Sequence, residues 1–222
     1  EVDHIYEAET ARAMGIEREG QIVTLIHCGS RGLGHQVAND YIKEMLNAMK
    51  LYQIELPDRQ LACSPVKSPQ GQAYLAAMKC AANYAWANRQ ILMHQAREVL
   101  EQVLGIGPRD LNMNLVYDVC HNIAKKEVHL VDGRERTLCV HRKGATRAFG
   151  PGSKELPSEY RKIGQPVLVP GSMGTSSWVL HGTEKAMKRS LGSCCHGAGR
   201  LMSRSKAKKT IWGEDLRARL EN

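Results

Sequence analysis

The spacing of apolar residues along the chain predicts several helices. Apolar positions recur every three or four residues over 1–20 and again over 35–50, the period of an amphipathic helix. The longest helix is expected from Ser68 and Pro69, which suit the N-cap and the first helical position, to near Gly105. A last helical region, strongly basic over 204–209, is expected after residue 199.

Short apolar runs between turn residues predict strands. Six are expected, at 21–27, 111–119, 127–131, 134–141, 166–169 and 178–180. The Asp132-Gly133 pair is a strong hairpin signal between the third and fourth of them. A hairpin and a mixture of elements favour an α+β fold, with mixed β-sheets and surrounding helices, over a parallel βαβ array. Residues 142–164, rich in Gly, Pro, Ser, Lys and Arg, are expected to form an extended surface loop.

Composition narrows the class of protein. The 222 residues, 42% of them hydrophobic, fit one large domain over 1–222. Lys and Arg total 31 against 23 Asp and Glu, a net charge of +8, which favours a polyanionic partner such as nucleic acid. Ordinary charge for solubility is the alternative explanation.

The cysteines and the apolar runs indicate where the protein works. Seven cysteines, an odd number without a CxxC pair, suggest a reducing cytosol. No apolar run approaches the roughly 18 residues of a membrane span, and the acidic first residues do not resemble a signal peptide. We therefore expect a cytoplasmic protein without membrane contact. The chain does not begin with Met, which suggests a fragment.

Two glycine-rich segments, 29–34 and 197–199, lie beside predicted helices. Backbone N–H groups at such helix starts can approach phosphate oxygens, and Arg31 lies in the first segment. Arg200 and Arg204 follow the second segment one helical turn apart, which suits bidentate contact with phosphate. Neither segment matches the P-loop or the Rossmann fingerprint, so tight turns that need glycine are an equal explanation.

Three histidines are candidates for chemistry. His27 and His121 each follow an apolar run that enters a loop, where a neutral imidazole could bind Mn, Zn or Fe, or could be structural. His196 lies between two cysteines and Gly-Ala-Gly, where it could act as a nucleophile or order a turn. Asn83, Trp86, Asn88 and Arg89 give the long helix a polar flank, for which a solvated face is expected.

Four motifs taken together resemble the RtcB family of RNA ligases. They are HCGSRGLGHQ at 27–36, DVCHNIA at 118–124, HRKGATR at 141–147 and CHGAGR at 195–200. Four long motifs in the same order are far more specific than one glycine loop. The resemblance covers nearly the whole chain and implies a mixed-sheet fold particular to that family.

The resemblance implies a GTP- and manganese-dependent ligase that acts in tRNA splicing and RNA repair. It would join RNA ending in a 2′,3′-cyclic phosphate or 3′-phosphate to RNA beginning with a 5′-hydroxyl. By family analogy, His196 attacks the α-phosphorus of GTP, and the guanylate then passes to the RNA 3′-phosphate. The alternatives are a non-catalytic module that binds GTP or RNA and a metal-dependent phosphoesterase. The resemblance leaves open whether an activating protein takes part.

The family's site residues carry over onto matching positions. His27 and His121 match manganese ligands, Arg31 and Arg200 match positions that contact RNA or phosphate, and 143–147 is expected to bind RNA. The nucleotide pocket is expected to comprise His121, Asn122, Pro170, Gly171, Ser172, Met173, Ser177, His196, Gly197, Ala198, Gly199 and Arg204.

Several family residues have no counterpart in this chain. An aspartate, a cysteine and a further histidine that bind manganese precede the matching region in the family, and a lysine that contacts guanine follows it. We therefore expect a truncated RtcB-like catalytic domain that holds the nucleophile without a complete two-manganese centre. Ligation by this chain alone should be weak or absent.

Overall fold

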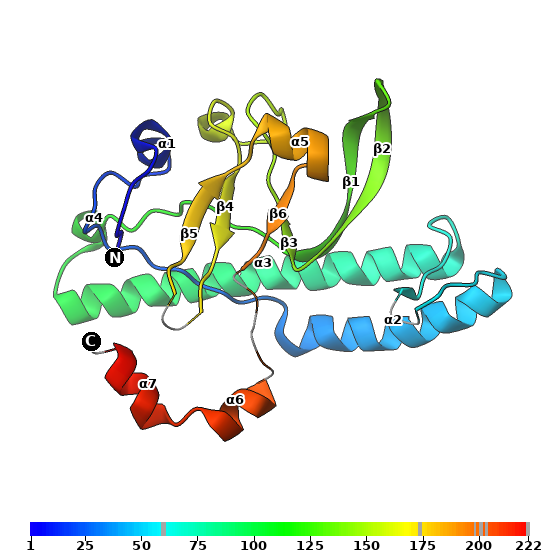
Figure 1. Ribbon diagram of the computed structural model, residues 1–222, viewed down its shortest axis with the longest axis horizontal. Helices are drawn as coiled ribbons and strands as arrows, with labels where there is room; N and C mark the ends of the chain where they lie inside the picture. The colour runs from blue at the N-terminus through cyan, green and yellow to red at the C-terminus, as the bar shows by residue number, and fades with distance from the viewer. Residues whose placement is uncertain (59–60, 173–174, 198, 200–201, 203, 221–222) are drawn as a thin grey trace. The chain divides into compact units, whose positions relative to one another are not determined.

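The computed structural model describes residues 1–58, 61–172, 175–197, 199, 202 and 204–220 (Figure 1). The chain forms two compact units. Unit 1 consists of Glu1–Ile22 and Asn114–Asn222, and unit 2 consists of Val23–Met113. Both contain helices, and every strand found among the described residues lies in unit 1, so the structure confirms the α+β class.

Unit 2 is built around two helices that pack along one another. Helix α2 spans Arg31–Leu51 and α3 spans Pro69–Leu104, with the short α4 at Pro108–Leu111. Small residues let the helices approach closely. The residues buried in α2 and α3 are Met45, Ala48, Gly71, Ala81 and Ala85.

The expected ends of the long helix are confirmed. The Ser68 hydroxyl accepts a hydrogen bond from the Gly71 N–H at 3.1 Å, as an N-cap does. Gly105 ends the helix in the left-handed conformation, with φ of 66°. The helix expected at 35–50 is also present, but it begins earlier, at Arg31.

Two expected strands do not form. Leu111 is the last residue of α4, and residues 21–27 and 112–119 form neither helix nor strand. Two apolar residues of the first segment, Ile22 and Leu25, are 76% and 44% exposed. Apolar runs of this kind indicate a tendency towards extended structure, but a strand also needs a neighbour to satisfy its backbone groups.

The expected hairpin is present in unit 1. Strands β1 (Asn122–Val131) and β2 (Arg134–Lys143) pair antiparallel from Asn122↔Lys143 to Val131↔Arg134. Asp132 and Gly133 both have positive φ, 51° and 74°, the conformation that a two-residue type I′ turn requires.

Two further pairs of strands complete the sheets of the described residues. Strand β4 (Pro166–Val169) pairs with β5 (Trp178–His181), as the apolar runs there predicted. Strand β3 (Ala145–Arg147) pairs with β6 (Ser193–Cys195), and helix α5 (Glu184–Ser190) precedes β6. These last three elements were not expected, because they are too short to show a period.

The segment 142–164 is not the extended surface loop that its composition predicted. It contains β3 and a 3₁₀ helix, η2, at Ser158–Tyr160. Phe149 and Leu156 are 2% and 1% exposed, and the Tyr160 hydroxyl donates to the Val116 carbonyl at 2.5 Å. Frequent turns break any regular period here, yet Phe149, Leu156 and Tyr160 are buried. Burial raises the pKa of Tyr160.

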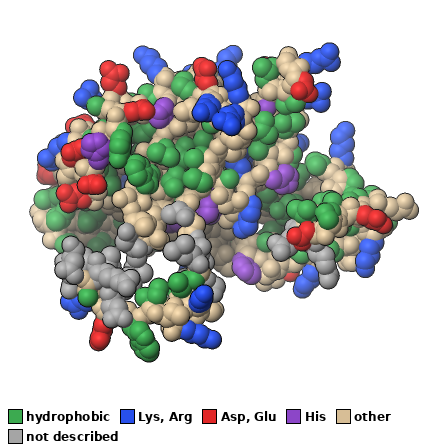
Figure 2. Space-filling model, viewed as in Figure 1, with side chains coloured by type: hydrophobic (Ala, Val, Ile, Leu, Met, Phe, Trp, Pro, Cys, Tyr) green, Lys and Arg blue, Asp and Glu red, His purple; other side chains and the backbone are tan. Residues whose placement is uncertain are grey.

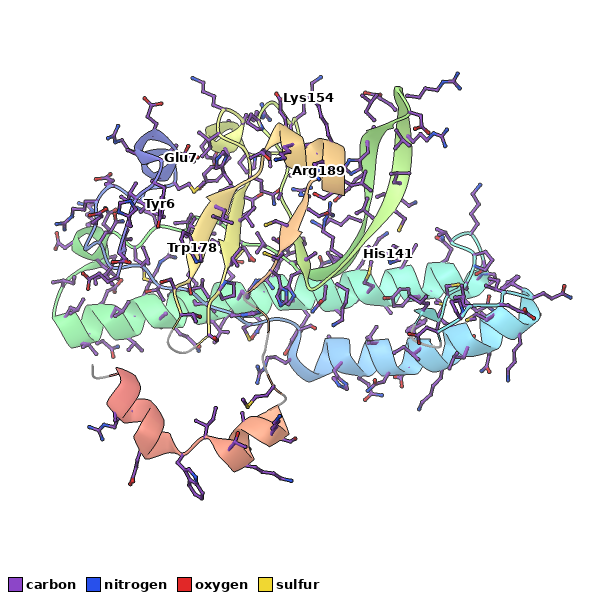
Figure 3. All side chains as sticks on the ribbon, in the orientation of Figure 1. Tyr6, Glu7, His141, Lys154, Trp178 and Arg189 are labelled. Atoms are coloured by element: carbon purple, nitrogen blue, oxygen red, sulfur yellow. The ribbon has the colours of Figure 1, made fainter. Side chains whose placement is uncertain are left out.

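The N-terminal segment lies against β5. Helix α1 spans Ala8–Ala13, shorter than the helix expected over 1–20. Just before it, the rings of Tyr6 and Trp178 lie 5.6 Å apart (Figure 3). A carboxylate oxygen of Glu7 lies 3.1 Å from the Nε2 atom of His181. Exposed apolar residues of β5 and Tyr6 contribute to the hydrophobic surface seen over β4 and β5 in Figure 2.

The C-terminal part contains two short helices, α6 (Arg204–Thr210) and α7 (Gly213–Leu220). The basic helix expected after residue 199 therefore begins at Arg204. Among the described residues, none of the helices combines the length and the apolar character needed to cross a membrane.

Candidate active site

His196 lies immediately after β6, and its imidazole is half-buried between two neighbours. Its Nδ1 is 2.8 Å from the carbonyl oxygen of Gly144. Its ring stacks on that of His121, with centroids 4.3 Å apart and planes inclined by 27°. Two histidines expected in the site, separated by 75 positions in the sequence, therefore lie in contact.

Gly144 links the two sheets that carry this pair. It follows the last residue of β2 and precedes the first of β3, with φ of 63° in the left-handed region that favours glycine. Its N–H donates to the Asn122 side-chain oxygen at 3.1 Å. A Cβ at this position would lie 3.4 Å from two atoms of the His196 ring. The turn is therefore shaped to admit the imidazole.

The hydrogen bond to Gly144 assigns the tautomer of His196. A carbonyl oxygen can only accept, so Nδ1 must carry the proton in this bond. In the neutral imidazole, Nε2 is then the unprotonated nitrogen, which carries the lone pair.

The loop between β4 and β5 approaches His196 from another side. The Gly171 N–H donates to the Ser177 hydroxyl at 3.0 Å, and the Ser172 N–H donates to Thr175 at 2.8 Å. A Cβ at Gly197 would lie 3.4 Å from the Pro170 carbonyl oxygen, so the two loops are close neighbours. Sequence reasoning missed the part played by Thr175.

Not all of the residues expected to bind the nucleotide or RNA phosphates can be placed. Met173, Ala198 and Arg200 lie outside the described residues, as does the side chain of Arg204. Gly199 is exposed and has φ of 78°, again a conformation that favours glycine. The described members of the expected pocket, from His121 to Gly199, all belong to unit 1.

A buried charged network lies on the inner face of the β1–β2 hairpin. Arg142 donates to both carboxylate oxygens of Glu127, at 2.7 and 2.9 Å, and the His129 ring is 3.0 Å from the same carboxylate. These three residues are 2–4% exposed. Burial alone would raise the pKa of Glu127, but the hydrogen bonds and charge of Arg142, together with His129, lower it. The carboxylate is therefore ionised in the folded unit.

Two further basic residues lie near this network. Burial, followed by the charge of Arg147, lowers the pKa of the Lys125 ammonium. Arg147 donates to Glu155 at 2.7 Å and to Gln165 at 3.1 Å, and its guanidinium lies 4.5 Å from the centroid of the Phe149 ring. Within the segment 143–147 expected to bind RNA, Arg147 thus already holds several internal contacts.

The first glycine-rich segment belongs to unit 2 and is held by helix α3. Asn88 donates to the Cys28 sulfur at 3.3 Å and to the Gly29 carbonyl at 3.0 Å, and Arg89 donates to the Cys28 carbonyl at 3.5 Å. Both α3 residues are half-buried. The polar flank of α3 is therefore not simply a solvated face, although Asn83 and Trp86 are exposed.

Cys28 and Arg31 have unusual environments in this segment. Burial would raise the pKa of the Cys28 thiol, but hydrogen bonds from Asn88, the Gly29 backbone and Arg31 lower it overall. Arg31 is exposed and has φ of 52°, a left-handed conformation that is uncommon outside glycine and often found at functional sites. His27, beside Cys28, is exposed.

The described residues do not assemble a metal centre within either unit. None of their side chains gather into a group of three or more His, Cys, Asp or Glu able to hold an ion. His27 belongs to unit 2 and His121 to unit 1. Burial and the neighbouring Cys195 raise the pKa of the Cys194 thiol, which does not suit a metal-binding thiolate.

Comparison with known proteins identifies the family. The family model described as tRNA-splicing ligase RtcB matches residues 1–222. Proteins named tRNA-splicing ligase RtcB from Archaeoglobus fulgidus and Methanococcus maripaludis are 57% and 56% identical over 220 residues, 99% of this chain. The homologue from Pyrococcus abyssi is 54% identical over 221 residues. The chain therefore belongs to the RtcB family, as its four motifs predicted.

The chain is shorter than these relatives. It spans 45% of the Archaeoglobus protein, 46% of the Methanococcus protein and 24% of the Pyrococcus protein. Family membership is thus shown for the whole chain, whereas the activity of the chain has to be inferred from its site.

Proposed function

We propose that this chain is the nucleophile-bearing part of a GTP- and Mn²⁺-dependent RNA ligase that acts in tRNA splicing and RNA repair. It would join a 2′,3′-cyclic phosphate or 3′-phosphate end to a 5′-hydroxyl end through a guanylate on His196. The observation that carries the proposal is the hydrogen bond from His196 Nδ1 to the Gly144 carbonyl, which makes Nε2 the unprotonated nitrogen of the neutral ring. The RtcB family match supports the reaction class.

The first step would be transfer of GMP to the histidine. Nε2 would form a bond to the α-phosphorus of GTP as the bond from that phosphorus to the bridging oxygen breaks, which releases pyrophosphate. The imidazole gains positive charge in this step, and the Nδ1–H bond to the Gly144 carbonyl would stabilise it. GMP would next pass to the RNA 3′-phosphate, and the 5′-hydroxyl would then displace it.

The loop between β4 and β5 is the proposed contact for the guanosine. Gly171 and Gly197 keep the backbone of the two neighbouring loops open, and Ser172 and Ser177 are exposed and carry hydroxyl groups. Small residues of this kind let a purine lie against backbone while hydroxyls supply hydrogen bonds. Asn122, which accepts from Gly144, would keep its amide N–H groups for the nucleotide.

Mn²⁺ is the proposed cofactor, with His27 and His121 as two of its ligands. When bound, the metal would neutralise charge on the phosphates. Arg31 and Arg200 are the proposed contacts to RNA phosphates, and 143–147 would add to them.

A chimera provides the test. Residues 1–222 would replace the matching segment of the Archaeoglobus fulgidus relative, to which they are 57% identical. The chimera would be incubated with Mn²⁺ and GTP labelled at the α-phosphate, then denatured. We expect label that stays on the protein and is lost in His196→Ala, and no transfer of label from the γ-phosphate.

The unaltered relative serves as the positive control for the same assay. If the relative is labelled and a folded chimera is not, the proposal is wrong for this chain. A chimera that binds GTP or RNA without covalent label would instead be a non-catalytic binding module. Release of phosphate without label would indicate a phosphoesterase.

A further inference from the structure

We propose that Arg142 is a positioning residue for His196, because its buried guanidinium holds the start of the short strand that leads to the nucleophile. The consequence for catalysis rests on the proposed function of His196. The contacts themselves do not, and they place Arg142 between the hairpin and β6.

Arg142 donates hydrogen bonds to two parts of unit 1 at once, the segment that begins β6 and the hairpin. Its Nε donates to the Ser193 hydroxyl at 2.9 Å, and Nη2 donates to the Leu191 carbonyl at 3.0 Å. Towards the hairpin, Nη1 and Nη2 form a bidentate pair with Glu127. A guanidinium gripped by a carboxylate on one side has a fixed plane, so its remaining donors are fixed as well.

The Glu127 carboxylate is itself fixed by a second neighbour, His129. The carboxylate can only accept, so His129 Nε2 donates to it at 3.0 Å, and the His129 ring meets Phe149 edge-on with centroids 5.7 Å apart. Every charged member of the network is almost fully buried. Little solvent reaches the network, so it resists rearrangement better than a surface ion pair would.

The contacts close a small ring that includes the nucleophile. The backbone runs from Arg142 to Gly144, whose carbonyl accepts from His196, and from His196 it runs back to Ser193, which bonds to Arg142. The backbone connections in this ring are short, because Gly144 lies two positions after Arg142 and His196 lies three positions after Ser193. A shift of Ser193 relative to Arg142 would therefore change the direction of the His196 imidazole.

The ladder alone gives this segment little support. Strand β6 has three residues and pairs only with the three of β3, from Ala145↔Cys195 to Arg147↔Ser193. The anchor at Ser193 comes from outside that ladder. We therefore infer that Arg142 decides how well the Nδ1–H bond to Gly144 is formed, and so which ring nitrogen carries the proton.

The test measures the tautomer of His196 in this 222-residue chain. The chain is labelled with ¹⁵N-histidine, and long-range ¹H–¹⁵N spectra are recorded at one pH where imidazoles are neutral. His196→Gln identifies the signals. In the unaltered chain we expect the Nδ1–H form to dominate.

Two variants weaken the anchor to different degrees. Ser193→Ala removes one contact and leaves the buried ion pair intact, and Arg142→Lys keeps the charge but loses the planar fork. In both we expect the ratio of the Nδ1–H to the Nε2–H form to fall by roughly three- to tenfold, as for a weakened hydrogen bond. Arg134→Lys, the same change at the exposed end of the hairpin, is the matched control and should leave the ratio unchanged.

The outcomes separate this inference from the proposed function. An unchanged ratio in folded Ser193→Ala overturns the positioning role, even if Arg142→Lys fails to fold. In the chimera, Ser193→Ala should lower the rate of labelling at saturating GTP without raising the GTP concentration for half-maximal rate. A shifted ratio in a chimera that is never labelled would defeat the ligase proposal while the positioning role stands.

Discussion

The loop that carries His196 and the loop that carries Cys28 make an instructive pair. Both are rich in glycine, and each contains or adjoins a histidine expected in the site. The His196 loop is fixed by a buried ion pair and a strand ladder inside unit 1. The Cys28 loop of unit 2 is held by side chains of one helix, and His27 beside it is exposed.

The two loops differ in how far the groups that fix their conformation are buried. Around His196, charged groups are removed from water, so losing one partner leaves the other buried without compensation. Around Cys28, the donors are half-buried, and water can replace what a substitution removes. We therefore expect the His196 loop to be more rigid than the Cys28 loop and to be disrupted more strongly by a single substitution.

The largest effect should come from breaking the buried ion pair. Arg142→Ala leaves the Glu127 carboxylate buried without its partner, which should lower the free energy of unfolding of unit 1 by roughly 3–5 kcal/mol. Urea unfolding followed by the fluorescence of Trp178, in a background in which Trp86 and Trp212 are replaced by Phe, would measure it. A double change to Glu127→Met and Arg142→Met should cost much less, because no charge is left behind. Equal losses in the single and double variants would contradict this account.

Acid should produce a part of the same loss. The folded-state pKa of Glu127 is lowered, so its ionisation stabilises the fold above the unfolded-state pKa, about 4.3 for glutamate, and this contribution disappears as pH falls through the folded value. Between about pH 5 and pH 3, the unaltered chain should therefore lose more stability than Glu127→Gln does. Parallel pH profiles of the two proteins would show that Glu127 contributes nothing to acid sensitivity.

A smaller effect is expected at the turn that holds the imidazole. Gly144→Ala forces alanine into a left-handed conformation, which costs about 1–2 kcal/mol, and brings a methyl group to 3.4 Å from the His196 ring. Gly152→Ala is the matched control, because its φ of 84° imposes a similar cost with no neighbour within 4 Å. Thermal unfolding should change alike in both. Only Gly144→Ala should shift the ring signals of His196, and an equal shift in both would remove the special role of Gly144.

The sequence predicts local structure well where the chemistry is local. Ser68 and Gly105 mark the ends of α3, and Asp132 with Gly133 marks the hairpin, because each of these residues suits its own conformation. The pairing of Ala145 with Cys195 is invisible in the sequence, because it joins two three-residue strands 50 positions apart. The strand expected at 21–27 fails for the converse reason, since its pattern says nothing about whether a partner strand exists.

The candidate site divides in the same way. His196, His121 and the loop from Pro170 to Ser177 could be named from the sequence because family motifs mark them. The contacts that hold these residues in place could not be predicted from the sequence. Gly144, Glu127 and Arg142 lie in or beside strands whose alternation gives no reason to join them to a loop 50 residues later, and only the fold brings them to Ser193 and His196.

The smallest expected effect concerns the Cys28 loop and sharpens the contrast. Asn88→Ala removes two hydrogen bonds that bridge α3 to the loop, one to the Cys28 sulfur, at a cost of about 1 kcal/mol or less because water can enter. The pKa of Cys28 should rise, since the Asn88 bond helps to lower it. At pH 7.5 a smaller fraction of the thiol would be ionised, so alkylation of Cys28 should slow, while well above the ordinary cysteine pKa the two proteins should react alike. Mass spectrometry of the peptide that contains Cys28, after timed exposure to iodoacetamide, distinguishes it from the other six cysteines.

The matched control is Asn83→Ala, at an exposed asparagine on the same helix, which should leave the rate of Cys28 alkylation unchanged. If Asn88→Ala instead destabilised its unit as strongly as Arg142→Ala destabilises unit 1, the two loops would not differ in how they are held.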